Sequence, residues 1–352
     1  MIIFNAHDHF RKPDSEEFKE AAPIFTKDSG GVAMMNFPEP LDITTPFKAV
    51  DFCFSYVDEI MAVAKAGGQM DYNLRLMPVL HNKMTRDDLE NFIAAARAAN
   101  LPLGGFKIFT PGTSTNSGTA PLVEQAPELI DAIENMGEIL AIHMEDPNPA
   151  VLVSDKEESA MENVLKKYLM KDGKQRKMKI SLEHLSTKRA VETAEEYGLK
   201  YTLTPHHLAF CLEDFGITDA AAVEKSLTQN PYFWCKPVIQ FRKNMEFLRE
   251  HWLNGSDNIM LGTDAAPHTK AKKEATPPMA GIFMGETKAS YEFAFPNNYI
   301  YNLLERYSKN AADFYGVDFD ALPHAMPAAA VEKNLAQVMN VRALAIEKGI
   351  VR

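Results

Sequence analysis

Short apolar runs alternate with amphipathic stretches along most of the chain. The runs have the length of strands, and most are continuously apolar rather than alternating, which is typical of parallel strands covered on both faces. We expect eight such strands, at residues 1–4, 31–37, 74–80, 106–109, 139–143, 178–185, 201–204 and 259–264.

Helix signals fill most of the intervals between these runs. Thr45 and Pro46 combine a capping residue with proline at the first helical position, and Gly137 and Gly198 stand where helices should end. We expect helices at residues 45–67, 85–100, 121–135, 157–170, 187–197 and 241–254.

The regular alternation of strands and helices predicts the architecture. Eight strands with helices between most of them are typical of an α/β fold of the closed (β/α)8 barrel type. We expect residues 1–352 to form a single barrel domain, in which about 286–352 is a mostly helical C-terminal extension on the outside.

Residues suited to metal binding stand at or near the C-terminal ends of these runs. His7 and His9 are separated by one residue, so in a strand their side chains point to the same face. Each such residue has an ordinary alternative when taken singly: a histidine can be a satisfied core residue, and Asp264 can cap a helix. In a barrel, however, the C-terminal strand ends form one common face. The candidates that meet there are His7, His9, Lys107, His143, His184 and Asp264.

The types of these residues indicate which metal they would bind. Imidazole nitrogens and a carboxylate suit zinc or a similar divalent transition metal better than calcium or magnesium. Four histidines, a carboxylate and Lys107 are too many ligands for one tetrahedral ion, so we expect two metals about 3.5–4 Å apart. A protonated ammonium cannot be a ligand. Lys107 must therefore be modified or serve another purpose.

Composition narrows the possible partners. The chain has 37 Lys and Arg against 48 Asp and Glu, a net charge of −11, which argues against nucleic acid or an anionic membrane as the main partner. No apolar run reaches about 18 residues, and the N-terminus lacks a signal-peptide pattern. Three cysteines far apart make no disulfide framework. We expect a soluble cytoplasmic protein.

The motifs resemble the amidohydrolase superfamily and, within it, the bacterial single-domain dihydroorotases. The resemblance runs from residue 1 to about 290 in the family's order. It rests on the stretches AHDHFR (6–11), MNFP (35–38), FKIF (106–109), TSTN (113–116), LAIH (140–143), LEHLSTK (182–188), TPHHL (204–208) and LGTDAAPH (261–268).

This resemblance implies a metal centre with assigned ligands. His7, His9 and Asp264 would hold one zinc, and His143 and His184 the other. Lys107, carbamylated by CO2, would bridge the two ions. A hydroxide shared by the metals would be the nucleophile, and Asp264 would act as general base and then general acid. The implied reaction is the reversible interconversion of N-carbamoyl-L-aspartate and L-dihydroorotate in pyrimidine biosynthesis, and the family's habit is a homodimer.

A second group of residues is expected to bind the substrate. Arg11 lies two residues beyond His9 and, if the strand continues that far, on the same face, where its guanidinium suits a carboxylate. Its ordinary alternative is a surface salt bridge. The resemblance implies further contacts from Asn36 and His268 to the carboxylate, from Ser114 and Thr115 in a mobile loop at 110–118, and from the backbone at Lys236 and Ala280.

Two features depart from the family or lie outside its pattern. The motif Cys235-Lys236-Pro237 has a lysine where similar enzymes usually have an apolar residue, which changes the local charge. His206 and His207 follow the seventh run, where the family places no metal ligand. We expect them to support the ligands or to face the substrate.

Other functions remain possible at this point. A hydantoinase or allantoinase would share the metal site, but a hydantoinase would have no carboxylate for Arg11 and Asn36 to hold. A non-catalytic barrel homologue would have lost ligands, whereas this chain keeps all six.

Overall fold

Eight parallel strands form the centre of the molecule. The structure is a computed structural model, and it describes residues 1–327 and 335–350. One parallel sheet has the order β1-β2-β3, and a second has the order β10-β9-β8-β5-β4. The strands are β1 (Phe4–Asp8), β2 (Gly30–Met35), β3 (Asn73–Pro78), β4 (Phe106–Phe109), β5 (Leu140–His143), β8 (Ile180–Leu182), β9 (Lys200–Thr202) and β10 (Ile259–Met260).

Backbone contacts join the two sheets at both edges and close the barrel. Beyond β3, Leu80 N–H donates to the carbonyl of Lys107 on β4 at 2.8 Å. On the other side, Ala6 N–H of β1 donates to the carbonyl of Leu261 at 2.8 Å, and Asp8 pairs with Ala265. The eight strands therefore follow one another in chain order around a closed ring. The predicted (β/α)8 fold is confirmed.

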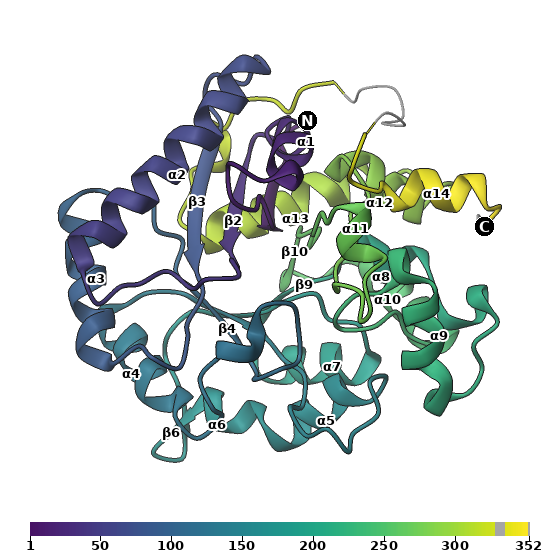
Figure 1. The fold of residues 1–352 in the computed structure, drawn as a ribbon, viewed down its shortest axis with the longest axis horizontal. Coiled ribbons are helices and arrows are strands. Elements are labelled where there is room, and N and C mark those ends of the chain that lie inside the picture. Colours follow the sequence, from purple (N-terminus) through teal and green to yellow (C-terminus); the bar gives the residue numbers. More distant parts are fainter. Residues whose placement is uncertain (328–334, 351–352) are drawn as a thin grey trace.

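Helices surround this ring in chain order (Figure 1). The main ones are α1 (Glu16–Phe25), α2 (Pro46–Ala66), α3 (Arg86–Ala98), α4 (Ala126–Met136), α5 (Lys156–Asn163), α6 (Leu165–Leu169), α7 (Lys188–Glu196), α10 (Arg242–Asn254) and α13 (Tyr301–Phe314). Shorter helices are α8 (Pro205–Ala209), α9 (Val223–Gln229), α11 (Lys270–Lys273), α12 (Thr287–Ala294) and α14 (Val341–Glu347). None of the helices in the described part of the chain is long and apolar enough to cross a membrane.

The C-terminal segment contributes a helix to the barrel itself. Helix α13 packs against β1 and β10. Its Asn310 side chain donates to the carbonyl of Ile259 at 2.8 Å, and Leu261 N–H donates to the carbonyl of Tyr307 at 3.1 Å. Part of the expected outer extension is therefore an integral layer around the strands.

Some elements differ from the expected ones. The first strand is Phe4–Asp8 rather than 1–4, because Asn5 and Asp8 are buried with partners: the Asn5 amide donates to Asp8 at 2.8 Å and to Thr263 at 3.0 Å. Helix α1 and a hairpin of β6 (Met170–Lys171) and β7 (Lys174–Gln175) were not expected. The single helix predicted at 157–170 is the pair α5 and α6.

Candidate functional site

Three of the predicted ligands meet at the junction of β1 and β10. His7 lies on β1, His9 follows it, and Asp264 follows β10. The Nε2 atoms of the two histidines are 3.3 Å apart, and they lie 3.3 Å (His7) and 3.2 Å (His9) from Oδ1 of Asp264. All three side chains are buried, and their donor atoms converge within 4.8 Å of one another. This group could hold a metal ion.

A second pair of histidines lies beside the first group. Nδ1 of His143, on β5, is 3.1 Å from Nε2 of His184, which follows β8. The rings of His184 and His7 have their centroids 5.4 Å apart. Two donor clusters therefore stand next to each other at the carboxyl ends of the strands, as the sequence predicts.

Lys107 is buried near both clusters. Its side chain is 0% exposed, and Nζ has no hydrogen-bond partner in the described part of the chain, lying 5.3 Å from the centroid of the Phe109 ring. Burial lowers the pKa of Lys107 to about 8, although the charges of Glu183 and Asp264 oppose the shift. A buried nitrogen with no acceptor fits a lysine that carries a further group.

Two glutamates that the sequence analysis missed orient the histidines. Glu183 contacts Nδ1 of His7, and Oε2 of Glu145 lies 2.8 Å from Nε2 of His143. These carboxylates fix the proton on one ring nitrogen and leave the other nitrogen free for a metal. Burial would raise the pKa of Glu183, but Lys107 and His7 outweigh burial and lower it to about 2. The sequence did hold a signal for these two glutamates, since each lies within two residues of a predicted metal ligand.

Three site residues have left-handed backbone conformations. The φ angles are 67° at Arg11, 45° at His184 and 48° at Asp264. Such angles cost a non-glycine residue roughly 1–3 kcal/mol and cluster at functional sites. Hydrogen bonds hold two of these residues in place: His184 N–H donates to Thr202 at 2.6 Å, and Asp264 N–H donates to the carbonyl of His7 at 2.9 Å.

A small cavity of about 20 Å³ borders the two clusters. It brings together residues from both predicted groups, the ligands and the substrate contacts. Its lining consists of His9, Arg11, Asn36, Phe109, Ser114, Thr115, His143, His184, Lys236, Asp264, Ala266, Ala280 and Gly281.

Arg11 reaches this cavity by a route that the sequence analysis did not foresee. The strand ends at Asp8, so a continued strand does not place Arg11 beside His9. Its left-handed backbone turns the side chain back, and Nε donates to the carbonyl of Pro267 at 3.1 Å. Nη2 lies 3.2 Å from Nε2 of His268. Burial lowers the pKa of Arg11 to about 10, which leaves it charged at neutral pH.

The predicted mobile loop covers the cavity. The Asn36 amide donates to the carbonyl of Thr115 at 2.9 Å, and the Asn116 amide donates to the carbonyl of Asn36 at 3.1 Å. The Thr115 hydroxyl donates to the carbonyl of Ala280 at 2.9 Å. A cavity of about 20 Å³ holds about one water molecule. The loop and the cavity lining thus leave little free space beside the two clusters.

The remaining predicted contacts flank the cavity. Lys236 lines it with its side chain, and the ammonium lies 4.9 Å from the centroid of the Trp234 ring without a hydrogen bond or ion pair to any described residue. His268 does not line the cavity. Its Nε2 lies 2.9 Å from the carbonyl of Ala280 and beside Arg11.

His206 and His207 form another buried group with Cys235 that resembles a metal site in spacing. Its polar atoms already have partners: Thr204 Oγ1 lies 3.2 Å from His206 and 3.0 Å from His207. His207 and Cys235 each lie 3.1 Å from the carbonyl of Pro237. Neither histidine is among the residues that line the cavity. The group ties together the loops behind the site.

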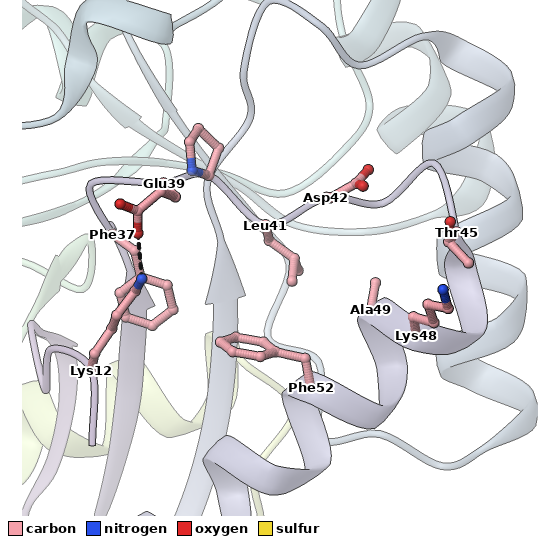
Figure 2. A pocket seen from close by; sticks show the side chains of 10 residues that line it. Lys12, Phe37, Glu39, Leu41, Asp42, Thr45, Lys48, Ala49 and Phe52 are labelled. Atoms are coloured by element: carbon pink, nitrogen blue, oxygen red, sulfur yellow. Dashed lines mark hydrogen bonds and ion pairs between the residues drawn. The ribbon is translucent and has the colours of Figure 1, made fainter. Parts of the chain in front are cut away.

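A chain of pockets leads from the surface to the cavity. Figure 2 shows an outer pocket of about 360 Å³, where Lys12 pairs with Glu39 above the ring of Phe37. Lys12 and Phe37 also line a middle pocket of about 180 Å³, which shares its inner wall with the cavity. That shared wall consists of Arg11, Asn36 and Thr115.

The chain is similar to known proteins along most of its length. No family model matches the chain. A curated dihydroorotase of Shewanella baltica is 28% identical over 325 residues, which cover 90% of this chain and 85% of that protein. A dihydroorotase of Shewanella denitrificans is 27% identical over 315 residues, with 87% and 84% covered.

Solved structures give the same result for the fold. Dihydroorotase from Saccharomyces cerevisiae, in complex with 5-fluoroorotic acid, has a TM-score of 0.72 at 21% identity, covering 91% of this chain and 85% of that one. Dihydroorotase from Campylobacter jejuni has a TM-score of 0.68 at 23% identity, and the alignment covers 90% of this chain and 84% of that one. An L-hydantoinase from Arthrobacter aurescens has a TM-score of 0.62 at 15% identity, and the alignment covers 89% of this chain and 70% of that one.

Fold and comparisons together show what this chain is similar to. It is a closed parallel barrel with histidine and carboxylate clusters at the carboxyl ends of its strands, and solved dihydroorotase and hydantoinase structures share the fold. Its sequence is similar to the curated dihydroorotases over most of its length.

Proposed function

We propose that the protein is a metal-dependent dihydroorotase, which interconverts N-carbamoyl-L-aspartate and L-dihydroorotate in pyrimidine biosynthesis. One observation carries this proposal: residues of two donor clusters line one cavity together with the cation Arg11, and Lys107 is buried close to both clusters. The relatives named dihydroorotase, alike along most of their length, support it.

The donor set fits a pair of zinc ions. His7, His9 and Asp264 would hold one ion, and His143 and His184 the other. Support comes from paired ring nitrogens 3.1–3.3 Å apart. In His7 and His143 a carboxylate on the other ring nitrogen leaves this nitrogen free to ligate. When bound, such a pair supplies Lewis acidity toward a carbonyl oxygen and makes water a nucleophile at neutral pH.

We assign a carbamate to Lys107. Its unprotonated Nζ would attack CO2, so that an N–C bond forms and one proton leaves the nitrogen. The product is an anion with two oxygen donors in place of a cation. The absence of any hydrogen-bond acceptor for Nζ among the described residues supports this assignment, because a permanent ammonium there would be buried without a hydrogen bond.

Asp264 is the proposed general base and acid. Its carboxylate would take a proton from the attacking water and deliver it to the amide nitrogen that leaves when the ring opens. Oδ1 lies beside His7 and His9, and the residue also lines the cavity. In ring closure the same carboxylate would move the proton in the opposite direction.

Arg11, Asn36 and His268 are proposed to hold the carboxylate of the substrate. Nε of Arg11 donates to the carbonyl of Pro267 and Nη2 lies beside His268, so the guanidinium is held in place with Nη1 remaining for the carboxylate. Ser114 and Thr115 would close over the bound substrate and exclude water. The backbone at Lys236 and Ala280 would contact the ring.

The wider setting is also proposed. The packing of α13 on β1 and β10 supports a single domain over residues 1–352. A small-molecule substrate, a cytoplasmic location, a possible homodimer and no nucleic-acid partner complete the proposal.

Metal content and turnover test this function together. We expect close to two zinc ions per chain by elemental analysis, and rapid hydrolysis of dihydroorotate followed at the ultraviolet absorbance of its ring. Two zinc ions without turnover would favour a hydantoinase or allantoinase, to be assayed with hydantoin and allantoin. Less than one metal without turnover would favour a non-catalytic barrel.

A further inference from the structure

A buried lysine connects two segments that line the cavity. Lys273 ends α11 and is 4% exposed. Its ammonium donates to three carbonyls, those of Trp234 at 3.0 Å, Met279 at 2.9 Å and Gly281 at 2.8 Å. The three N–H donors of the side chain are thus all used on backbone oxygens.

These bonds determine which way the neighbouring peptide faces. Carbonyls of successive residues in an extended chain point to opposite sides. Lys273 holds those of Met279 and Gly281, and the carbonyl of Ala280 between them meets Thr115 and His268 instead, at 2.9 Å each. The direction of Ala280 toward the cavity therefore depends on Lys273.

The second segment is fixed by the same group. Trp234 accepts from Lys273 and also from Gly281 N–H, at 2.9 Å, so the two segments are joined at one point. Lys236, two residues further on, lines the cavity. Gly281 has φ of 147°, and a Cβ there would lie 2.9 Å from Nε2 of His268, so the segment approaches His268 closely.

A stabilising role alone explains this arrangement poorly. An ammonium that leaves water for three neutral carbonyls pays a desolvation penalty that an apolar side chain would avoid. We propose that Lys273 is a positioning residue, which orients segments 279–281 and 234–236 so that their backbone meets the ring of the bound substrate. This inference rests on the proposed function, because the ring contacts belong to it.

The protonation of Lys273 gives an additional readout. Burial lowers its pKa to about 7, and the charge of Arg11 acts in the same direction. Cys235 is neutral because burial raises its pKa, His268 is neutral because burial lowers its pKa, and Lys272 adds positive charge nearby. Above pH 7 Lys273 is mostly a neutral amine, which has two N–H groups for three carbonyls. One carbonyl then loses its donor and its segment is oriented less firmly, so the KM for substrate should rise with pH.

The test compares Lys273→Met, Lys273→Arg and, as a matched control, Lys270→Met on the exposed side of the same helix. For Lys273→Met we expect KM for dihydroorotate to rise about tenfold, with kcat within about threefold of wild type and unchanged metal content. Lys273→Arg, which stays charged, should recover most of the loss and abolish the rise of KM with pH. Lys270→Met should match wild type.

Three outcomes would overturn the inference. Lys273→Met with the wild-type KM would do so, whether or not its Tm falls. So would a pH-dependent rise of KM that persists in Lys273→Arg. If Lys273→Met does not fold, the test is the pH dependence of KM in the wild-type protein. A KM for dihydroorotate that stays constant from about pH 6 to 9 contradicts the proposal. A wild-type protein that does not turn over dihydroorotate would instead refute the proposed function.

Discussion

Replacement of Arg11 by alanine should remove most of the activity while leaving the metal centre intact. Arg11 is partly buried and charged, its Nε donates to the carbonyl of Pro267, and the residue lines the cavity. Removing one partner of a buried, hydrogen-bonded charge pair costs about 2–5 kcal/mol. Since 1.4 kcal/mol is tenfold, kcat/KM for dihydroorotate should fall by about 30-fold to about 4,000-fold.

Three comparisons make this test specific. Arg11→Lys keeps the charge without the bidentate geometry and should lie between wild type and Arg11→Ala. Dihydrouracil has the same ring without the carboxylate, so its turnover should change little. Arg86→Ala, on the exposed pair of α3, should behave as wild type.

The assay is the ultraviolet absorbance of the ring, with metal content measured on the same sample. Arg11→Ala with full metal and kcat/KM within about threefold of wild type would refute the carboxylate assignment. Loss of metal together with activity would show that Arg11 supports the metal centre and not the substrate.

The remaining predictions concern two lysines of the cavity region. Protein stripped of metal in CO2-free buffer should reload fully only when bicarbonate is added, and Lys107→Met should bind less than half the metal of wild type. Elemental analysis checks both, and loading that ignores bicarbonate would contradict the carbamate. Lys236→Leu should lower kcat/KM for the anionic substrate about twofold to fivefold and weaken its dependence on salt, because the ammonium is an unpaired positive charge at the cavity. Salt curves identical to wild type would show that only the Lys236 backbone matters.

The barrel could be predicted because its strands are short and fully buried. Continuous apolar runs such as 106–109 and 139–143 coincide with β4 and β5 almost residue for residue. Parallel strands align their carboxyl ends, so ligands placed at those ends had to converge. The spacing of Phe18, Ala21, Ala22 and Phe25 carries the helical period of α1, but Pro23 inside the helix hides it.

The partners of the ligands were harder to predict. Glu145 and Glu183 each lie near a histidine in the sequence, yet Glu183 contacts His7 of a distant strand rather than its neighbour His184. Only the closed ring brings the end of β8 within reach of β1, three strands away through β9 and β10. Likewise, nothing in the sequence of α11 distinguishes buried Lys273 from its exposed neighbours.

The left-handed backbone at Arg11 allows the placement of its side chain to be tested apart from the stability of the protein. Asp and His tolerate such conformations better than most residues, whereas Arg gains nothing local from it. If the strain at Arg11 serves only to aim the guanidinium, glycine should relieve it and alanine should not. Arg11→Gly should then unfold about 1–2 °C above Arg11→Ala, from roughly 1 kcal/mol of relieved strain, while both lack activity. Equal melting temperatures would mean that the surrounding loop, and not the backbone of Arg11, carries the strain.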